Sequence, residues 1–481
     1  MESSLNPSDL HAVEEHLTAF WEDFDTRYTD KVQRQPVQTL YGGAQLFKAD
    51  TAKKMGDLAL KAMDTYAPNF VYLAKAAQLS MHQHLPEDWQ ASEALAAAIA
   101  DNPEAAKPLN PEAFLAYTIY TRVQDKLKNE PVEDFRIDFE DGYGNRPDDE
   151  EDNDAVRTAQ EVAKGMTEGI LPPFIGIRIK PWTRQLFQRS ARTLDIFVSA
   201  LLKATDKQLP ANFVVTLPKV THPTQVSGLV SLLEKIEAEQ GLASGTLLLE
   251  IMVETTQSIL DAQGQVMLPQ LLAAAKGRCR GAHFGTYDYT ASCNIIARYQ
   301  SMDHPACDFS RHMMQVAFSG TGVMLSDGAT NIMPVPVHRA AEGETLNLIQ
   351  HQENLTAVHK AWALHSDHIR HSLTHGHYQG WDLHPAQLIT RYAVVYDFFL
   401  RELKNSTLRF QNFVSKAAQA TLSGDVFDDA ATGRGLLNYF RLAHNSGAIT
   451  ESEIESAGLT VADLTGGTGS GASPWLALIA E

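Results

Sequence analysis

Residues 213–253, FVVTLPKVTHPTQVSGLVSLLEKIEAEQGLASGTLLLEIMV, decide the fold. The two ends of this stretch, 213–218 and 246–253, are short apolar runs of the kind that form buried strands. Between them, residues 223–240 place apolar side chains at the spacing of an amphipathic helix. A strand, a helix and a second strand in this order predict a βαβ unit whose strands are parallel.

The same alternation continues on both sides of this unit. Helical patterns such as 184–205 and 265–276 separate further strand candidates. Those candidates are 36–42, 135–139, 174–179, 281–285, 322–326 and 379–383. Eight strands alternating with helices is the count of a TIM (β/α)8 barrel, and a doubly wound parallel sheet is the alternative. The barrel is favoured because polar residues repeatedly follow the strands, where barrel enzymes place their chemistry.

Helical segments extend this predicted α/β barrel. An N-terminal helix is expected over 7–34, with Ser8 as its N-cap. We divide the chain into an N-terminal helix (1–35), a barrel (36–385), a C-terminal helical region (386–461) and a flexible, glycine-rich tail (462–481). A helical insertion after the first strand covers about 48–130 of the barrel segment.

Composition and charge exclude several classes of protein. The 481 residues include 40 basic and 59 acidic side chains, giving a formal charge of −19. Such a chain repels nucleic acid and anionic membranes, so we expect neither as a partner. The sequence shows no signal peptide and no apolar run long enough to cross a bilayer, which predicts a cytoplasmic protein. Its three cysteines indicate neither a disulfide framework nor a zinc site.

Carboxylates follow several of the predicted strands. Asp138, Glu140 and Asp141 lie in IDFEDGYG (137–144), where they would either hold a metal or its bound waters, or cap the next helix. Glu254 ends the strand at 246–253 and is the better metal-ligand candidate there. Asp288 follows the next strand and would complete a Mg²⁺ site with Glu254, since such sites use one or two carboxylates plus water and substrate.

Cationic side chains also lie at strand ends. Arg178 and Lys180 alternate on one face of IGIRIKPW, where they would bind a substrate carboxylate, stabilise an enolate oxygen or form structural ion pairs. Lys219 follows a strand and a proline, and would form a Schiff base, bind a phosphate, or simply be paired or solvated. Glu250 lies deeper in its strand, so we expect it to pair with Arg178 or Lys180.

Histidines are crowded into residues 351–384. His365, His368 and His371 are spaced by three, which places them roughly along one side of a helix. A transition-metal site is conceivable, but the sequence favours a solvated helix face, because no carboxylate or cysteine joins the cluster at ligand spacing. The other members are His351, His359, His375, His377 and His384.

Six segments in this order resemble the HpcH/HpaI aldolase and citrate lyase beta-subunit family, whose superfamily includes malate synthase. The resemblance covers roughly 131–404 and the first strand at 36–47. Lys180 stands where that family has an asparagine. The segments are IDFEDGYG, IRIKPW, VVTLPKV, IMVETTQ, HFGTYDYT and GWDLHPAQL.

The resemblance implies a carbon–carbon lyase dependent on Mg²⁺ or Mn²⁺. Its small-molecule substrate would be a 2-oxo or 3-hydroxy acid, or the coenzyme A (CoA) thioester of such an acid. Glu254 and Asp288 would bind the metal, and Arg178 would stabilise the enolate, which agrees with the chemistry of aldol and Claisen cleavage. Glu140 and Asp141 would hold metal-bound waters or position the substrate.

Further implications of the resemblance concern substrate contacts and assembly. A homo-oligomer is expected. The expected substrate contacts are Lys180, Lys219, Gly285 and Thr286. Two alternatives stay open: a malate-synthase-like condensing enzyme, and a barrel that binds oxo acids without catalysis.

Overall fold

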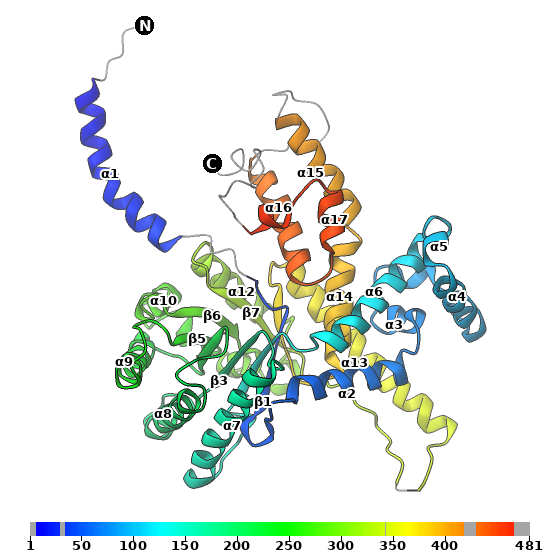
Figure 1. Cartoon of the computed structure of the whole chain (residues 1–481), viewed down its shortest axis with the longest axis horizontal. Coiled ribbons are helices and arrows are strands. Elements are labelled where there is room, and N and C mark those ends of the chain that lie inside the picture. Colours follow the sequence, from blue (N-terminus) through cyan, green and yellow to red (C-terminus); the bar gives the residue numbers. More distant parts are fainter. Residues whose placement is uncertain (1–5, 29–33, 342, 418–429, 466–481) are drawn as a thin grey trace.

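The computed structural model describes residues 6–28, 34–341, 343–417 and 430–465. Eight parallel strands form a closed barrel, in which each strand pairs with the next and β8 pairs with β1 (Figure 1). The predicted barrel is confirmed, and the doubly wound sheet is excluded. The strands are β1 (Gln38–Gly43), β2 (Asp134–Asp138), β3 (Phe174–Arg178), β4 (Phe213–Leu217), β5 (Leu248–Val253), β6 (Cys279–Phe284), β7 (Met324–Ala329) and β8 (Gln379–Asp382).

Helices between the strands cover the outside of the barrel (Figure 1). Pro223 begins α9, and Gly241 ends it in the left-handed conformation that glycine adopts without strain. The helices after β2 are α7 (Asp148–Glu168), α8 (Phe187–Ala204), α9 (Pro223–Gln240), α10 (Leu268–Ala274), α11 (Thr286–Ser292), α12 (Pro305–Phe318), α13 (Leu348–Thr374) and α14 (Gln387–Leu400). Short 3₁₀ helices are η1 (Ala44–Leu46), η2 (His82–His84), η3 (Thr256–Ser258) and η4 (Ala297–Tyr299).

The predicted helical insertion lies between β1 and β2. Its longest helix, α6, packs against α2, α3 and α14. Small buried side chains such as Ala113 and Ala116 let these helices approach closely. The inserted helices are α2 (Thr51–Tyr66), α3 (Phe70–Ala76), α4 (Trp89–Asp101), α5 (Pro103–Leu109) and α6 (Pro111–Asn129).

The N-terminal helix, α1 (Pro7–Arg27), is shorter than predicted and extends away from the barrel (Figure 1). Asn6, not Ser8, is its N-cap, because the Asn6 side chain accepts hydrogen bonds from the backbone N–H groups of Ser8 and Asp9. The helix exposes a row of large apolar side chains. These are Leu10, Val13, Phe20, Trp21 and Phe24.

The C-terminal extension is helical, as predicted. It consists of α15 (Leu403–Ala417), α16 (Ala430–Asn445), α17 (Glu451–Ser456) and α18 (Val461–Leu464). Because α18 is helical and Leu464 is buried, the first residues of the predicted tail are ordered structure. The rest of that tail, 466–481, lies outside the described residues. Within the described part of the chain, every helix is too short or too polar to span a membrane.

Candidate active site

Six of the predicted site residues converge at the carboxyl ends of neighbouring strands. Each follows or ends a strand from β2 to β6, so the closed barrel brings them to one mouth. They are Glu140 and Asp141 after β2, Arg178 at the end of β3, Lys219 after β4, Glu254 after β5 and Asp288 in α11 after β6.

Lys219 lies at the centre of this group. Its Nζ is 3.2 Å from an oxygen of Asp141, 3.2 Å from an oxygen of Asp288, and also contacts Glu140. Its backbone N–H donates to Glu254 Oε1 at 2.6 Å, and its φ of 49° lies in the left-handed region that residues other than glycine rarely adopt. Burial lowers the pKa of Lys219, but the surrounding carboxylates outweigh it and raise the pKa above its usual range. The ammonium therefore stays charged.

The carboxylates outnumber the cations at the mouth. Burial raises the pKa of Glu254 to about 7, although Lys219 opposes the shift. Burial also raises the pKa of Glu140 to about 7. Asp141 is more open, and its hydrogen bond with Glu140 and the charge of Lys219 lower its pKa despite partial burial. Burial thus opposes ionisation of Glu140 and Glu254 in the absence of a counter-charge. Hard oxygen donors in such a setting fit a divalent cation such as Mg²⁺, for which Glu254 and Asp288 are the candidate ligands.

These raised pKa values predict that the metal-free protein loses stability as pH rises. Glu140 and Glu254 have an ordinary pKa of 4.5 and a folded-state pKa of about 7. Between about pH 4.5 and about pH 7 the unfolded chain releases these protons first, so stability falls across this window and then levels off. A Mg²⁺ ion held by Glu254 would require the ionised form of this carboxylate, so the increase in Tm that it produces should grow from about pH 5.5 to about pH 8. A Mg²⁺ effect on Tm that is independent of pH would contradict this assignment.

Gly285 leaves space for the side chain of Glu254. A Cβ atom at residue 285 would lie 2.3 Å from Glu254 Oε2 and 2.5 Å from Glu254 Cβ. Thr286, the next residue, is buried, and within the described structure its Oγ1 has no hydrogen-bond partner. The predicted substrate contacts of Gly285 and Thr286 stay predictions.

Gly285→Ala is therefore expected to displace the Glu254 carboxylate and weaken Mg²⁺ binding by about 10- to 100-fold, the loss seen when a group that orients a ligand is removed. Calorimetric titration with Mg²⁺ measures it. Gly435→Ala in α16 is the matched control, because a Cβ there meets no atom within 4 Å. Equal Mg²⁺ affinity in both variants would show that Glu254 is not a ligand.

Arg178 is fixed beside the carboxylates. Its Nε and Nη2 donate to the two oxygens of Asp138 at 2.7 and 2.5 Å, and its Nη1 lies 3.2 Å from Glu140 Oε2. The guanidinium also lies over the rings of Tyr41 and Trp381, at 4.7 and 5.5 Å from their centroids. The side chain is 2% exposed, so its position is set before any substrate arrives. A rigid cation beside a metal site can stabilise an enolate oxygen.

Lys180 is not brought to this cluster. Its Nζ donates to the Phe139 carbonyl at 2.6 Å and pairs with Glu151 of α7 at 2.9 Å. β3 ends at Arg178, so the two-residue alternation that placed both cations on one face stops before Lys180. The structure thus gives Lys180 a structural ion pair.

The prediction that Glu250 pairs with Arg178 or Lys180 is wrong. Glu250 pairs with Arg136 at 2.7 Å and with His283 at 2.9 Å, and not with Arg178 or Lys180. Arg178 instead forms an ion pair with Asp138, which lies nearer the mouth. Because Arg136 and His283 lower the pKa of Glu250 despite its burial, this carboxylate stays ionised deep in the barrel.

Sequence reasoning identified Asp138 but missed the rest of the polar network that supports the mouth. Asp134, Arg136 and Asp138 alternate along β2, which is a signal that all three share one face. His283 links this network to the mouth, because its Nδ1 lies 2.8 Å from the hydroxyl of Tyr41, whose ring lies under Arg178. Asp138 holds Arg178 directly and also accepts the backbone N–H of Glu140 at 2.9 Å, so this end of the network reaches the carboxylate cluster.

The histidine cluster is not a solvated helix face, so that prediction is wrong. His365 is buried and lies 3.0 Å from Asp382, and His368 is buried and lies 2.7 Å from the Thr330 hydroxyl. Burial lowers the pKa of both imidazoles. A carboxylate that is distant in sequence, Asp308, lies 2.7 Å from His371.

A family model matches residues 19–470, which is nearly the whole chain. The chain belongs to the DUF6986 family, described as a domain of unknown function. No curated protein sequence matches it.

Several solved structures are similar to this DUF6986 protein. A citrate lyase from Burkholderia xenovorans LB400 has 19% identity and a TM-score of 0.46, covering 70% of this chain and 92% of its own. A malate synthase from Haloferax volcanii has 12% identity and a TM-score of 0.40, covering 88% and 96%. An HpcH/HpaI aldolase/citrate lyase family protein from Burkholderia cenocepacia J2315 has 11% identity and a TM-score of 0.34, covering 57% and 86%. The last of these structures bears the name of the family that the sequence motifs resemble.

Proposed function

We propose that this protein is a Mg²⁺-dependent enzyme that cleaves a carbon–carbon bond next to a carbonyl group, through an enolate. The observation that carries the proposal is the convergence of Glu140, Asp141, Glu254 and Asp288 around Lys219, with Arg178 fixed beside them. The substrate class is a 2-oxo or 3-hydroxy acid, or its CoA thioester. Mn²⁺ would suit the same oxygen donors.

Each residue at the mouth would have its own role in the reaction. Glu254 and Asp288 would hold the metal, which when bound supplies a Lewis acid for the carbonyl oxygen. Arg178 lies ready to stabilise the negative charge of the enolate, because it is rigid and partly directed toward Glu140. Lys219 offers its ammonium to a substrate carboxylate. Glu140, with a pKa of about 7, can accept the hydroxyl proton of the substrate as the bond breaks.

Oxalate tests the proposal because it mimics the enolate of pyruvate. We expect calorimetry to show oxalate binding that requires Mg²⁺, followed by cleavage of members of a panel of 4-hydroxy-2-oxo acids and acyl thioesters. Binding without turnover across the panel would favour the alternative, a barrel that senses an oxo acid. Absence of oxalate binding with Mg²⁺ present would refute the enolate site.

Condensation in the manner of malate synthase is the second candidate, and Glu140 favours it as well. A carboxylate with a pKa of about 7 can remove a proton from an acetyl methyl group at neutral pH. Exchange of the acetyl protons of acetyl-CoA with deuterated solvent would support condensation, and failure of that exchange would leave cleavage as the function. Assembly as a homo-oligomer in the cytoplasm is carried over as a proposal, tested by light scattering and by fractionation.

A further inference from the structure

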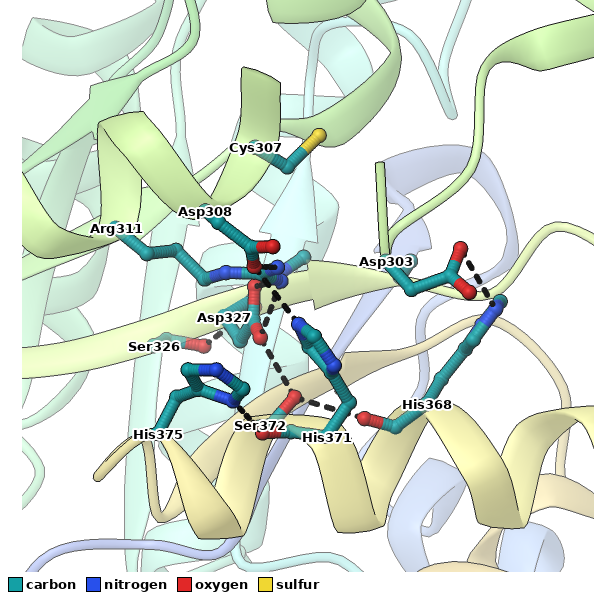
Figure 2. A network of polar contacts seen from close by, with 12 residues as sticks. Asp303, Cys307, Asp308, Arg311, Ser326, Asp327, His368, His371, Ser372 and His375 are labelled. Atoms are coloured by element: carbon teal, nitrogen blue, oxygen red, sulfur yellow. Dashed lines mark hydrogen bonds and ion pairs between the residues drawn. The ribbon is translucent and has the colours of Figure 1, made fainter. Parts of the chain in front are cut away.

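Two helices on the outside of the barrel bring together a second set of ligand-type side chains (Figure 2). Asp308 lies on α12, while His371 lies one turn before His375, the C-cap residue of α13. One ligand atom from each side chain lies within 4.8 Å of the other two. None of the three contributes to the carboxylate cluster at the mouth, so this group is a separate feature of the molecule.

The imidazole of His375 is held in a tautomer that can bind a metal. Its Nδ1 lies 2.7 Å from the carbonyl oxygen of His371. A carbonyl oxygen only accepts hydrogen bonds, so Nδ1 carries the proton, and in the neutral ring Nε2 keeps its lone pair. Histidines that ligate metals usually donate their other N–H to a carbonyl or carboxylate in this way, which fixes the ring and its tautomer.

The charges around the group favour a cation. Asp308 contacts both His371, at 2.7 Å, and Arg311. Arg311 is in turn bound by both oxygens of the buried Asp327, at 3.0 and 2.9 Å (Figure 2). One guanidinium thus faces two carboxylates, and the local excess of charge is negative. A cation replacing the contact between His371 and Asp308 would neutralise that excess.

We propose that Asp308, His371 and His375 form a site for a transition metal of the zinc class, such as Zn²⁺ or Co²⁺. Two imidazoles and a carboxylate are the donors that these ions select, whereas Mg²⁺ prefers oxygen donors. Three protein ligands leave a fourth position for water or for His312, whose ring centre lies 5.7 Å from that of His375. The bound metal joins α12 to α13 and so stiffens the wall around β7. The site does not depend on the proposed function.

Calorimetric titration of the full chain with Zn²⁺, in a buffer that contains excess Mg²⁺ to occupy the mouth, tests the site. We expect one equivalent of Zn²⁺ to bind, and His375→Gln to weaken binding by about 100-fold or more, because even the loss of a group outside the ligand shell costs 10- to 100-fold. His351→Gln is the matched control, since His351 is an exposed histidine on the same helix. It should bind as tightly as the wild type.

Asp308→Asn provides a second variant, and the visible absorption of Co²⁺ provides a second measurement. Nitrogen and oxygen ligands in a four-coordinate site give Co²⁺ a strong visible band, which the wild type and His351→Gln should show and both ligand variants should lack. Absence of Zn²⁺ binding in the wild type would overturn the proposal. So would an affinity for Zn²⁺ in His375→Gln equal to that of the wild type.

Discussion

Glu254→Gln is expected to abolish Mg²⁺ binding at the mouth and to lower enzymatic activity by at least about 100-fold, the loss expected when the charge stabilisation of an enolate is removed. Glutamine has nearly the shape of glutamate and still accepts the backbone N–H of Lys219, which lies 2.6 Å from Glu254 Oε1. The variant therefore loses the ligand charge while the loop after β4 keeps its anchor.

The same variant is expected to be more stable than the wild type when metal is absent. Glu254 is 1% exposed, and its pKa is raised from 4.5 to about 7. At about pH 8 the wild type must carry this buried charge beside Asp288 and Glu140, at a cost of about 1–3 kcal/mol. Removing the charge recovers that free energy, which is the usual trade between stability and function at an active site.

Thermal unfolding at about pH 8, with and without Mg²⁺, separates these effects. The wild type should gain Tm on adding Mg²⁺, whereas Glu254→Gln should begin at a higher Tm and show no gain. Glu239→Gln is a suitable control, because Glu239 pairs with Lys235 on the surface of α9. A Mg²⁺-dependent gain in Tm that persists in Glu254→Gln would remove Glu254 from the metal site.

The strands β3, β4 and β5 were predictable because each is almost wholly buried and so reads as a short apolar run between helical patterns. The convergence of Glu140, Lys219 and Glu254 was predictable for a related reason. In a closed barrel of parallel strands, all residues that follow strand ends meet at one mouth. Their joint position thus follows from topology alone, without knowledge of any side-chain contact.

The partners inside the barrel could not be predicted in the same way. Period-two alternation shows that Glu250 points inward, but it does not show which layer of the barrel this side chain shares with Arg136 or Arg178. The layer depends on the stagger between neighbouring strands, which cannot be read from the sequence. The prediction of a solvated histidine face was wrong for another reason, since an imidazole suits both a solvated and a buried helix face. His365 is buried because Asp382 and Thr390, distant in sequence, satisfy both of its ring nitrogens.

Arg136→Met is expected to destabilise the protein by about 3–5 kcal/mol, because it removes one partner from a buried ion-pair network. Arg136 is 3% exposed, and it contacts Asp134, Glu250 and the Thr216 hydroxyl. Methionine fills part of the space but leaves two buried carboxylates without their guanidinium. His283 remains beside Glu250 at 2.9 Å and compensates for only part of the loss.

The size of this effect should depend on pH. The pKa of Glu250 is lowered in the wild type, so its pairing stabilises the fold above its ordinary pKa of 4.5 and is lost only in strong acid. In Arg136→Met the pKa of Glu250 rises, and protonation near about pH 5 relieves the unpaired charge. The loss of stability should therefore be larger at about pH 8 than at about pH 5, and Arg136→Met/Glu250→Gln should recover part of it.

Urea unfolding of these variants at both pH values provides the measurement. Arg192→Met is the control, because Arg192 pairs with Asp152 on an exposed surface and such pairs contribute little to stability. If Arg136→Met unfolded at the same urea concentration as Arg192→Met, the interior network would not stabilise the barrel. The same network touches the mouth, because Tyr41 contacts both His283 and Arg178.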